Sequence, residues 1–234
     1  LGEATDNELT RGHRGTMKVF VRARDKAAHG SVPHLAVNPN YTLAKFLSRL
    51  RDVPMAKDPV LGPATVAPTI YLTDQQSMNV IPSQAWVCLD WRSVPGEDFE
   101  DVVAKLRPLA EASLEPGGSV SLEPIADLDL HTYTGQVRQR TISLPGYLLP
   151  LDHPVVTSGH AALEAGLGRP VAVRTWGFCT DAPHLMEFGV PTVGFAPAVE
   201  GVPHTATDHV RIDKLEEAYR GNIALAAGLG AAKL

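Results

Sequence analysis

Apolar and polar residues alternate over residues 17–24, where Met17, Val19, Val21 and Ala23 are separated by Lys, Phe and Arg side chains. A period of two residues predicts a strand with one buried face. The pair Asn38-Pro39 then combines a favoured N-cap residue with proline at the first helical position. We therefore expect a helix from this pair to about residue 51.

The residue pattern predicts three more strands and one more helix after this helix. Strands are expected over 66–73, 85–92 and 120–130, and a second helix is expected over 99–112. Pro68 places the first of these strands at a sheet edge, because proline cannot donate a backbone hydrogen bond. The order strand, helix, strand, strand, helix, strand predicts a ferredoxin-like βαββαβ sandwich.

A second region has a different pattern. Residues 131–151 are polar and interrupted by Pro145-Gly146, which predicts a linker or a crossing segment. Beyond them, helices are expected over 153–166, 182–188 and 212–229, and short buried strands over 171–175 and 191–195. The helix 212–229 is expected to turn one apolar side inward, formed by Leu215, Tyr219, Ile223 and Ala226. Helices that alternate with buried strands indicate an α/β layer fold.

Composition narrows the function classes. Hydrophobic residues are 44% and charged residues 20% of the chain, as in globular domains, and the net charge of −5 argues against a nucleic-acid or anionic-membrane binder. No apolar run approaches the ~18 residues of a membrane helix, and no signal peptide opens the sequence. Two cysteines, Cys88 and Cys179, are too few for a disulfide scaffold. We expect a cytoplasmic protein without nucleic-acid or membrane partners.

Taken one at a time, the candidate functional residues have ordinary interpretations. A glutamate near a chain end is usually a solvated charge, and a loop histidine is usually a surface or capping residue. Asp181 most simply caps a helix, and a strand arginine usually makes an ion pair or a cation–π contact. The residues in question are Glu3, His29, His34, Asn79, Arg92, Thr180, Asp181 and His204.

Their order along the chain is more specific. The motifs run Gly-Glu-Ala-Thr at residue 2, Ala-His-Gly-Ser at 28, Pro-His at 33, Asn-Pro at 38, Asn-Val-Ile-Pro at 79, Thr-Asp-Ala at 180 and Pro-His-Thr at 203. This series resembles the co-catalytic zinc amidohydrolases and peptidases of the ArgE/DapE/carboxypeptidase G superfamily. The stretches Gly12-His13-Arg14-Gly15 and Trp176-Gly177-Phe178 look closest to its selenium-metabolism-linked hydrolase branch.

The resemblance implies an α/β fold in three segments. Residues 1–15 would end an N-terminal catalytic portion, 16–130 would form the βαββαβ lid that also makes the dimer, and 131–234 would be the C-terminal part of an aminopeptidase-like catalytic domain. Glu3 and His204 would bind one zinc ion of a two-metal site, with cobalt or manganese as alternatives. A carboxylate and an imidazole suit Zn²⁺.

The resemblance also assigns contacts with a small-molecule or dipeptide substrate. His29 is similar to the lid histidine that reaches the partner subunit's active site and hydrogen-bonds the oxyanion of the tetrahedral intermediate. Asn79 and Arg92 look like the lid residues that hold the substrate's carboxylate, which a guanidinium matches bidentately. Thr180 and Asp181 match the loop on the substrate side.

Some expected residues of the family do not occur. The sequence contains no His-x-Asp, and its only Glu-Glu is Glu216-Glu217 in the last predicted helix. We therefore expect the C-terminal part of a homodimeric zinc hydrolase that cleaves amide bonds of N-acyl amino acids or short peptides. An N-terminal half would supply the general base, and this chain alone would be inactive. The alternative is an inactive dimerisation or binding scaffold derived from the same family.

Overall fold

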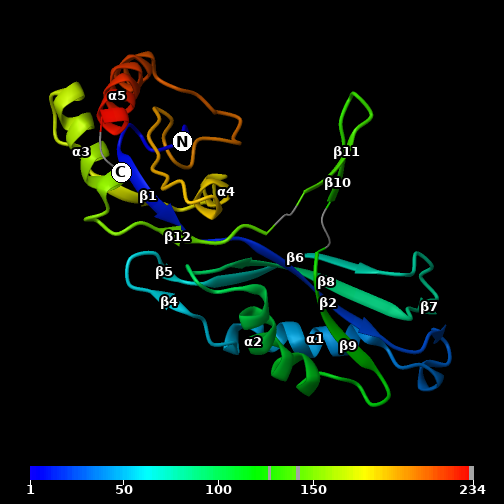
Figure 1. Cartoon of the computed structure of the whole chain (residues 1–234). Helices are drawn as coiled ribbons and strands as arrows, with labels where there is room; N and C mark the ends of the chain where they lie inside the picture. Colours follow the sequence, from blue (N-terminus) through cyan, green and yellow to red (C-terminus); the bar gives the residue numbers. More distant parts are fainter. Residues whose placement is uncertain (126–127, 141–142, 232–234) are drawn as a thin grey trace. The chain divides into compact units, whose positions relative to one another are not determined.

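The computed structural model describes residues 1–125, 128–140 and 143–231, which belong to two compact units (Figure 1). The inserted unit is Gly15–Pro145, and the flanking unit combines Leu1–Arg14 with Gly146–Leu234. Within the described ranges, no helix has the length and apolar character that crossing a membrane requires.

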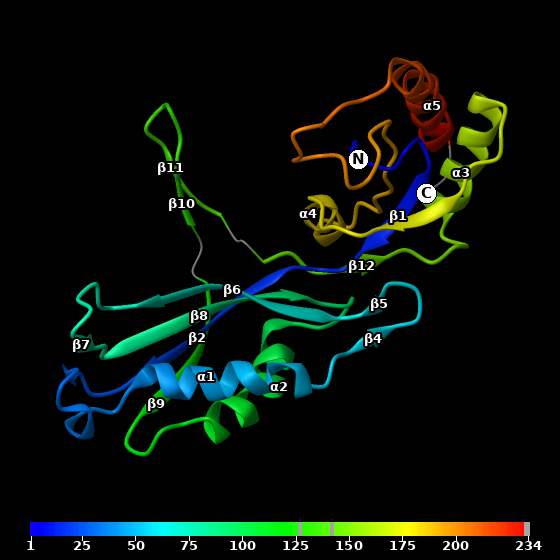
Figure 2. The ribbon, with the colours of Figure 1, turned by 180° about the vertical axis from the view of Figure 1, so that it is seen from behind.

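The inserted unit has the predicted βαββαβ order. Its main elements are β2 (Met17–Arg24), α1 (Pro39–Arg49), β6 (Thr65–Thr73), β8 (Gln84–Arg92), α2 (Phe99–Ala112) and β9 (Ser119–Pro124). The four strands form an antiparallel sheet in the order β6-β8-β2-β9, so β6 lies at an edge as its proline predicts. Figures 1 and 2 show α1 and α2 on the same face of this sheet.

Local sequence signals explain where these elements begin and which sides they bury. The Asn38 side chain accepts a hydrogen bond from the backbone N–H of Asn40 at the start of α1, and Asp98 forms a capping box with Asp101 at the start of α2. The alternating apolar residues of β2 and β8 face the two helices and form one core. Its members of under 2% exposure include Val19, Val21, Leu43, Phe46, Leu89, Trp91, Val102 and Leu106.

Shorter elements complete the inserted unit. They are β3 (Ala28–His29) paired with β7 (Val80–Ile81), β4 (Lys57–Asp58) paired with β5 (Gly62–Pro63), β10 (Leu128–His131) paired with β11 (Val137–Arg140), and two 3₁₀ turns, η1 (Pro33–Leu35) and η2 (Leu50–Asp52). The segment 131–151, predicted as a linker or a crossing segment, contains β11 and a further strand, β12 (Tyr147–Leu148). The strand predicted over 120–130 is divided into β9 and β10, with 126–127 outside the described residues.

The flanking unit has one sheet, whose strands come from both segments of the chain that flank the inserted unit. Its elements are β1 (Leu9–His13), β12 (Tyr147–Leu148), α3 (Pro154–Leu167), β13 (Val173–Trp176), α4 (Ala182–Glu187) and α5 (Ile212–Ala231). The sheet order is β12-β1-β13, with β1 antiparallel to β12 and parallel to β13. The strand predicted over 191–195 is reduced to a bridge between Thr10 and Gly194, although Val193 and Phe195 are buried as expected.

The prediction for the buried side of α5 was wrong. Leu215, Tyr219 and Ile223 are 57%, 71% and 53% exposed, whereas Ala218 is buried. The contact with α3 instead uses Leu225 and Leu229 together with small residues. A Cβ added to Gly166 would lie 2.4 Å from the Cβ of Ala224, so only a glycine allows the two helices to approach this closely.

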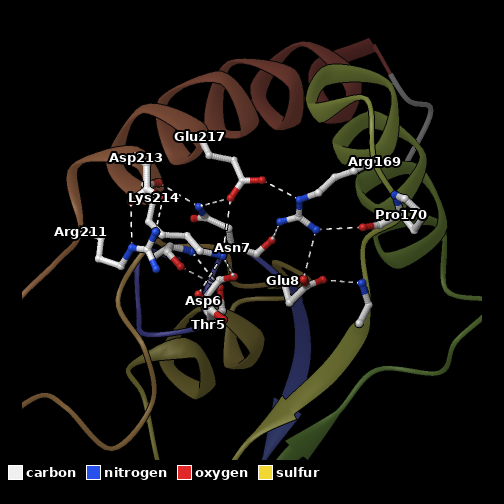
Figure 3. Close-up of polar contacts among 12 residues, drawn as sticks. Thr5, Asp6, Asn7, Glu8, Arg169, Pro170, Arg211, Asp213, Lys214 and Glu217 are labelled. Carbon is white, nitrogen blue, oxygen red and sulfur yellow. Dashed lines mark hydrogen bonds and ion pairs between the residues drawn. The ribbon is translucent and has the colours of Figure 1, made fainter.

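A polar cluster ties α5 to the residues before β1 (Figure 3). Arg169 donates from Nε to Glu217, from Nη1 to Glu8 and from Nη2 to the carbonyl oxygen of Asn7. The buried Asn7 side chain also donates to Glu217, over 2.8 Å. Asp6 and Asn7 have φ angles of 53° and 59°, a left-handed turn that asparagine and aspartate tolerate better than most residues. The cluster fixes the segment that carries Glu3.

Candidate functional site

The candidate residues divide between the two units. Four of them lie in the inserted unit: His29, His34, Asn79 and Arg92. The others lie in the flanking unit: Glu3, Thr180, Asp181 and His204. The helices and strands of each unit position that unit's candidate residues, so the two groups of residues are described separately.

The structure brings His29 and Asn79 together. The pairing of β3 with β7 sets His29 opposite Val80, and the Gly30 N–H donates to the Asn79 carbonyl over 2.7 Å. As a result the Asn79 side-chain amide lies 3.3 Å from Nε2 of His29. The other ring nitrogen, Nδ1, lies 2.8 Å from the Ser31 hydroxyl. Both side chains are exposed, so this pair can meet a molecule from outside the unit.

Arg92 lies at the end of β8 in a cluster of charges. Its guanidinium contacts Asp90 in a bidentate manner, with Nε 2.9 Å from Oδ1 and Nη2 3.0 Å from Oδ2. Lys18 reaches the same carboxylate at 2.8 Å. Burial raises the pKa of Asp90, but hydrogen bonds and charge from Lys18 and Arg92 outweigh it and leave the pKa below its usual value. The cluster of two cations and one anion keeps a net positive charge.

Arg92 and the His29–Asn79 pair occupy opposite ends of the sheet. β8 starts at Gln84, beside the end of β2 from which the chain continues toward His29, and Arg92 is its last residue. Eight residues of strand span about 26 Å at ~3.3 Å per residue. This separation exceeds the reach of a small substrate, so Asn79 and Arg92 of one lid cannot hold the same substrate carboxylate, and their role in substrate binding stays a prediction.

In the flanking unit, Thr180 is buried and contacts His13, a residue mentioned above only as part of the Gly12-His13-Arg14-Gly15 stretch. Its backbone N–H and hydroxyl lie 3.1 and 2.9 Å from Nε2 of the fully buried His13, and the hydroxyl accepts from the Ala182 N–H. These contacts place Thr180 directly ahead of the N-cap residue of α4 and leave its hydroxyl inside the protein. His13 is the last residue of β1, and the other residues of this strand are buried as well. This position is the feature that could have identified His13 as an interior residue.

The hydrogen bonds define the protonation of His13. Because the Thr180 N–H can only donate, Nε2 must accept, so the ring proton sits on Nδ1 and is donated to the Arg14 carbonyl 2.8 Å away. Tyr147 packs edge-on against this ring with centroids 4.9 Å apart. Burial lowers the pKa of His13, although the hydrogen bond to the Arg14 carbonyl opposes the shift. The residue is a neutral structural group.

Asp181 is the N-cap residue of α4, yet its side chain makes no capping hydrogen bond. Asp181 thus occupies the N-cap position without capping the helix through its side chain. The neighbouring Thr180 hydroxyl accepts the hydrogen bond from the Ala182 N–H instead. The Asp181 side chain is exposed and remains available to a ligand.

Glu3 and His204 are both exposed, and within the described residues neither side chain has a hydrogen-bond partner. His204 has a φ of 67°, a left-handed conformation that is costly for a residue with a Cβ. Strained backbone of this kind is frequent at functional sites. Their chemistry suits zinc, but no three His, Cys, Asp or Glu side chains of the described residues gather where they could hold an ion. A zinc site needs at least three protein ligands, so these residues do not complete one.

Known proteins resemble this chain in both sequence and structure. Residues 11–118 match the peptidase dimerisation domain family of the M20 peptidases. The chain is 26% identical over 209 residues to the uncharacterized protein YgeY of Escherichia coli K12, covering 88% of this chain and 51% of YgeY. It is 27% identical over 208 residues to a succinyl-diaminopimelate desuccinylase of Dinoroseobacter shibae, covering 88% of this chain and 50% of that enzyme.

Among solved structures, the aminopeptidase PepT of Bacillus cereus superimposes with a TM-score of 0.70 at 19% identity, covering 98% of this chain and 56% of PepT. This likeness confirms the expected α/β fold. The chain spans about half the length of the curated relatives it matches. The family match over residues 11–118, the curated relatives and the shared fold together indicate that the chain resembles the M20 peptidases and deacylases, with the similarity to a peptidase dimerisation domain in residues 11–118.

Proposed function

We propose that this chain carries the lid and the C-terminal catalytic segment of a homodimeric hydrolase that cleaves amide bonds in N-acyl amino acids or short peptides. The supporting observation is the arrangement of polar groups on the inserted unit. An exposed imidazole beside an amide lies at one end of the sheet, and a net positive arginine cluster lies at the other. A tetrahedral oxyanion needs a hydrogen-bond donor, and a terminal carboxylate needs a cation.

The separation along β8 determines how these groups would be used. The two ends of one lid are about 26 Å apart, so they serve different active sites. In a two-fold dimer, each site would take His29 and Asn79 from one protomer and Arg92 from the other. Thr180 would position the start of α4, whereas the exposed Asp181 would face the substrate.

The dimer would form through the edge strand β6. Its side chains Ile70, Tyr71 and Leu72 are 50%, 43% and 48% exposed, on both faces of the strand. A long exposed edge with apolar residues favours pairing with another chain, and a two-fold contact is the commonest form of such pairing. Sedimentation should detect a dimer at micromolar concentration.

Glu3 and His204 would supply one carboxylate and one imidazole to a zinc ion, which polarises a substrate carbonyl and activates water when it is bound in such enzymes. Because these two residues do not complete a site among the described residues, we expect further ligands and the general base from a segment outside this sequence. We accordingly expect no turnover by the 234-residue chain with zinc on N-acetyl amino acids or dipeptides.

The coding sequence ahead of Leu1 is the first test. A His-x-Asp motif and a Glu-Glu pair there would support the hydrolase, whereas their absence would favour the alternative of a dimerising or binding scaffold. If they are present, the full gene product should be assayed on the same substrates.

The dimer model is tested by mixing two inactive variants of that product, His29→Ala and Arg92→Ala. Random exchange gives heterodimers in half of the molecules, each with one intact site, so about a quarter of the wild-type activity should return. If His29 and Arg92 of the same protomer served the same active site, every site in the heterodimer would lack one of them, and mixing would restore no activity.

A further inference from the structure

The turn after β3 controls the chemistry of His29 through Ser31. The Val32 N–H donates to the His29 carbonyl over 3.0 Å and closes a turn over residues 29–32. This turn directs the Ser31 backbone N–H at Nδ1 of the His29 ring, 3.2 Å away, and puts the Ser31 hydroxyl 2.8 Å from the same atom.

These contacts allow only one arrangement of protons. A backbone N–H always donates, so Nδ1 of His29 must accept and cannot carry a proton. A neutral ring whose Nδ1 accepts carries its proton on Nε2. The Ser31 hydroxyl then donates to Nδ1 as well. A doubly protonated ring would set two N–H groups against each other at Nδ1.

The Asn79 amide adapts to this tautomer. Its oxygen and nitrogen differ in shape only by their hydrogens, so the hydrogen-bond partners decide its orientation. With the proton on Nε2 of His29, the group that faces it at 3.3 Å must be the amide oxygen. The amide nitrogen then faces the Ser77 hydroxyl, 2.6 Å from the other end of the amide, and donates to it. One chain of hydrogen bonds thus runs from Ser31 through His29 and Asn79 to Ser77.

We infer that Ser31 is a positioning residue that fixes His29 in the Nε2–H tautomer, with this N–H directed outward on the Asn79 side. The inference rests on the proposed function for its catalytic meaning, because an oxyanion needs a hydrogen-bond donor and the Nε2–H is that donor. In the free protein Asn79 accepts this hydrogen bond, and an arriving oxyanion would replace it.

The tautomer is measured in the 234-residue chain by ¹⁵N NMR of the imidazole nitrogens above pH 7. His34 is the internal reference, because it is exposed in the same loop and no described residue hydrogen-bonds to its ring. We expect His29 to show a single Nε2–H form while His34 shows a mixture of both tautomers. Ser31→Ala removes the hydroxyl but keeps the backbone N–H, so the His29 signals should move part of the way toward those of His34. Ser48→Ala, which removes an exposed hydroxyl of α1, should leave them unchanged.

Two results would overturn the inference: a His29 ring protonated on Nδ1, or a His29 mixture equal to that of His34 in the unmodified chain. In the full gene product, Ser31→Ala should lower kcat by about 2- to 10-fold with KM unchanged, the effect of one neutral hydrogen bond made in the transition state. If the Nε2–H form is found but His29→Ala leaves kcat unchanged, the proposed function fails and the tautomer assignment stands.

Discussion

The flanking unit should be sensitive to mild acid because it buries a neutral histidine. His13 is fully buried, and burial holds its pKa below the value of 6.5 that it regains in the unfolded chain. Between these two values the unfolded chain binds a proton that the folded one does not, so stability falls as the pH drops below 6.5 and is fully present above it. Within this window the free energy of unfolding should fall by up to about 1.4 kcal/mol per pH unit.

The variant His13→Gln isolates this effect. Glutamine does not titrate, and its amide oxygen can accept from the Thr180 N–H. We expect the variant to be less stable by about 1–3 kcal/mol at pH 7.5, because packing and hydrogen bonds are imperfect, and to lose the slope between pH 6.5 and 5. Arg169 holds the pKa of Glu217 below 4.5 mainly by hydrogen bonding, so this carboxylate loses its contribution only at lower pH.

The assay is urea denaturation followed by NMR of two indole N–H signals. Trp176 donates to the Ala4 carbonyl over 3.0 Å and reports on the flanking unit, whereas Trp91 donates to Glu97 over 3.1 Å and reports on the inserted unit. The exposed His184 provides the matched control His184→Gln. The reasoning is refuted if the Trp176 transition keeps the same slope between pH 6.5 and 5 in His13→Gln as in the unmodified chain.

Further expectations concern packing, assembly and metal binding. Gly228→Ala should destabilise the flanking unit by about 1–2 kcal/mol, because the new Cβ would lie 2.5 Å from that of Ala162. Gly230→Ala, where the new Cβ would meet open space, should stabilise the unit by up to about 1 kcal/mol. Thermal melting of both variants tests these two expectations. Ile70→Lys at the β6 edge should shift the sedimentation equilibrium toward monomer, and an unchanged dimer would exclude this edge as the interface. Zinc titrated into the 234-residue chain should bind weakly by calorimetry, because two donors are too few, and tight binding would contradict the predicted ligand set.

The elements that could be predicted from sequence are those in which local pattern and tertiary environment agree. The alternation over 17–24 and the Asn38-Pro39 signal are local, and both elements form as expected. The hairpin of β10 and β11 was missed because its residues are mostly polar. The face of α5 was misjudged because an amphipathic pattern identifies an apolar side but not what covers it. In this unit the close contact with α3 is made through glycine and alanine, which carry almost no hydrophobic signal.

The candidate site shows the same limit. The proximity of His29 and Asn79 joins residues 50 positions apart through a two-residue strand pairing, which no local pattern encodes. The order of the motifs identifies His29, Asn79 and Arg92 as candidates together, but it does not show how far apart they lie. The register of β8 shows that Arg92 lies at the other end of the sheet. The motif identifies Thr180 only as part of the loop on the substrate side, and it does not show that the Thr180 hydroxyl hydrogen-bonds a histidine buried in β1.

The insertion of one unit into the other has an entropic consequence. The flanking unit is built from two segments that roughly 130 residues of the inserted unit separate, and its strands β1 and β12 pair on either side of this insertion. When the inserted unit is folded, Thr16 and Leu144 are joined by two hydrogen bonds of 2.8 Å, so the loop that β1 and β12 must close is only a few residues long. Each doubling of a flexible loop costs about 0.6 kcal/mol, so melting the insertion would add about 3 kcal/mol to the closure cost. The inserted unit thus stabilises its host through chain connectivity alone, and it should fold first.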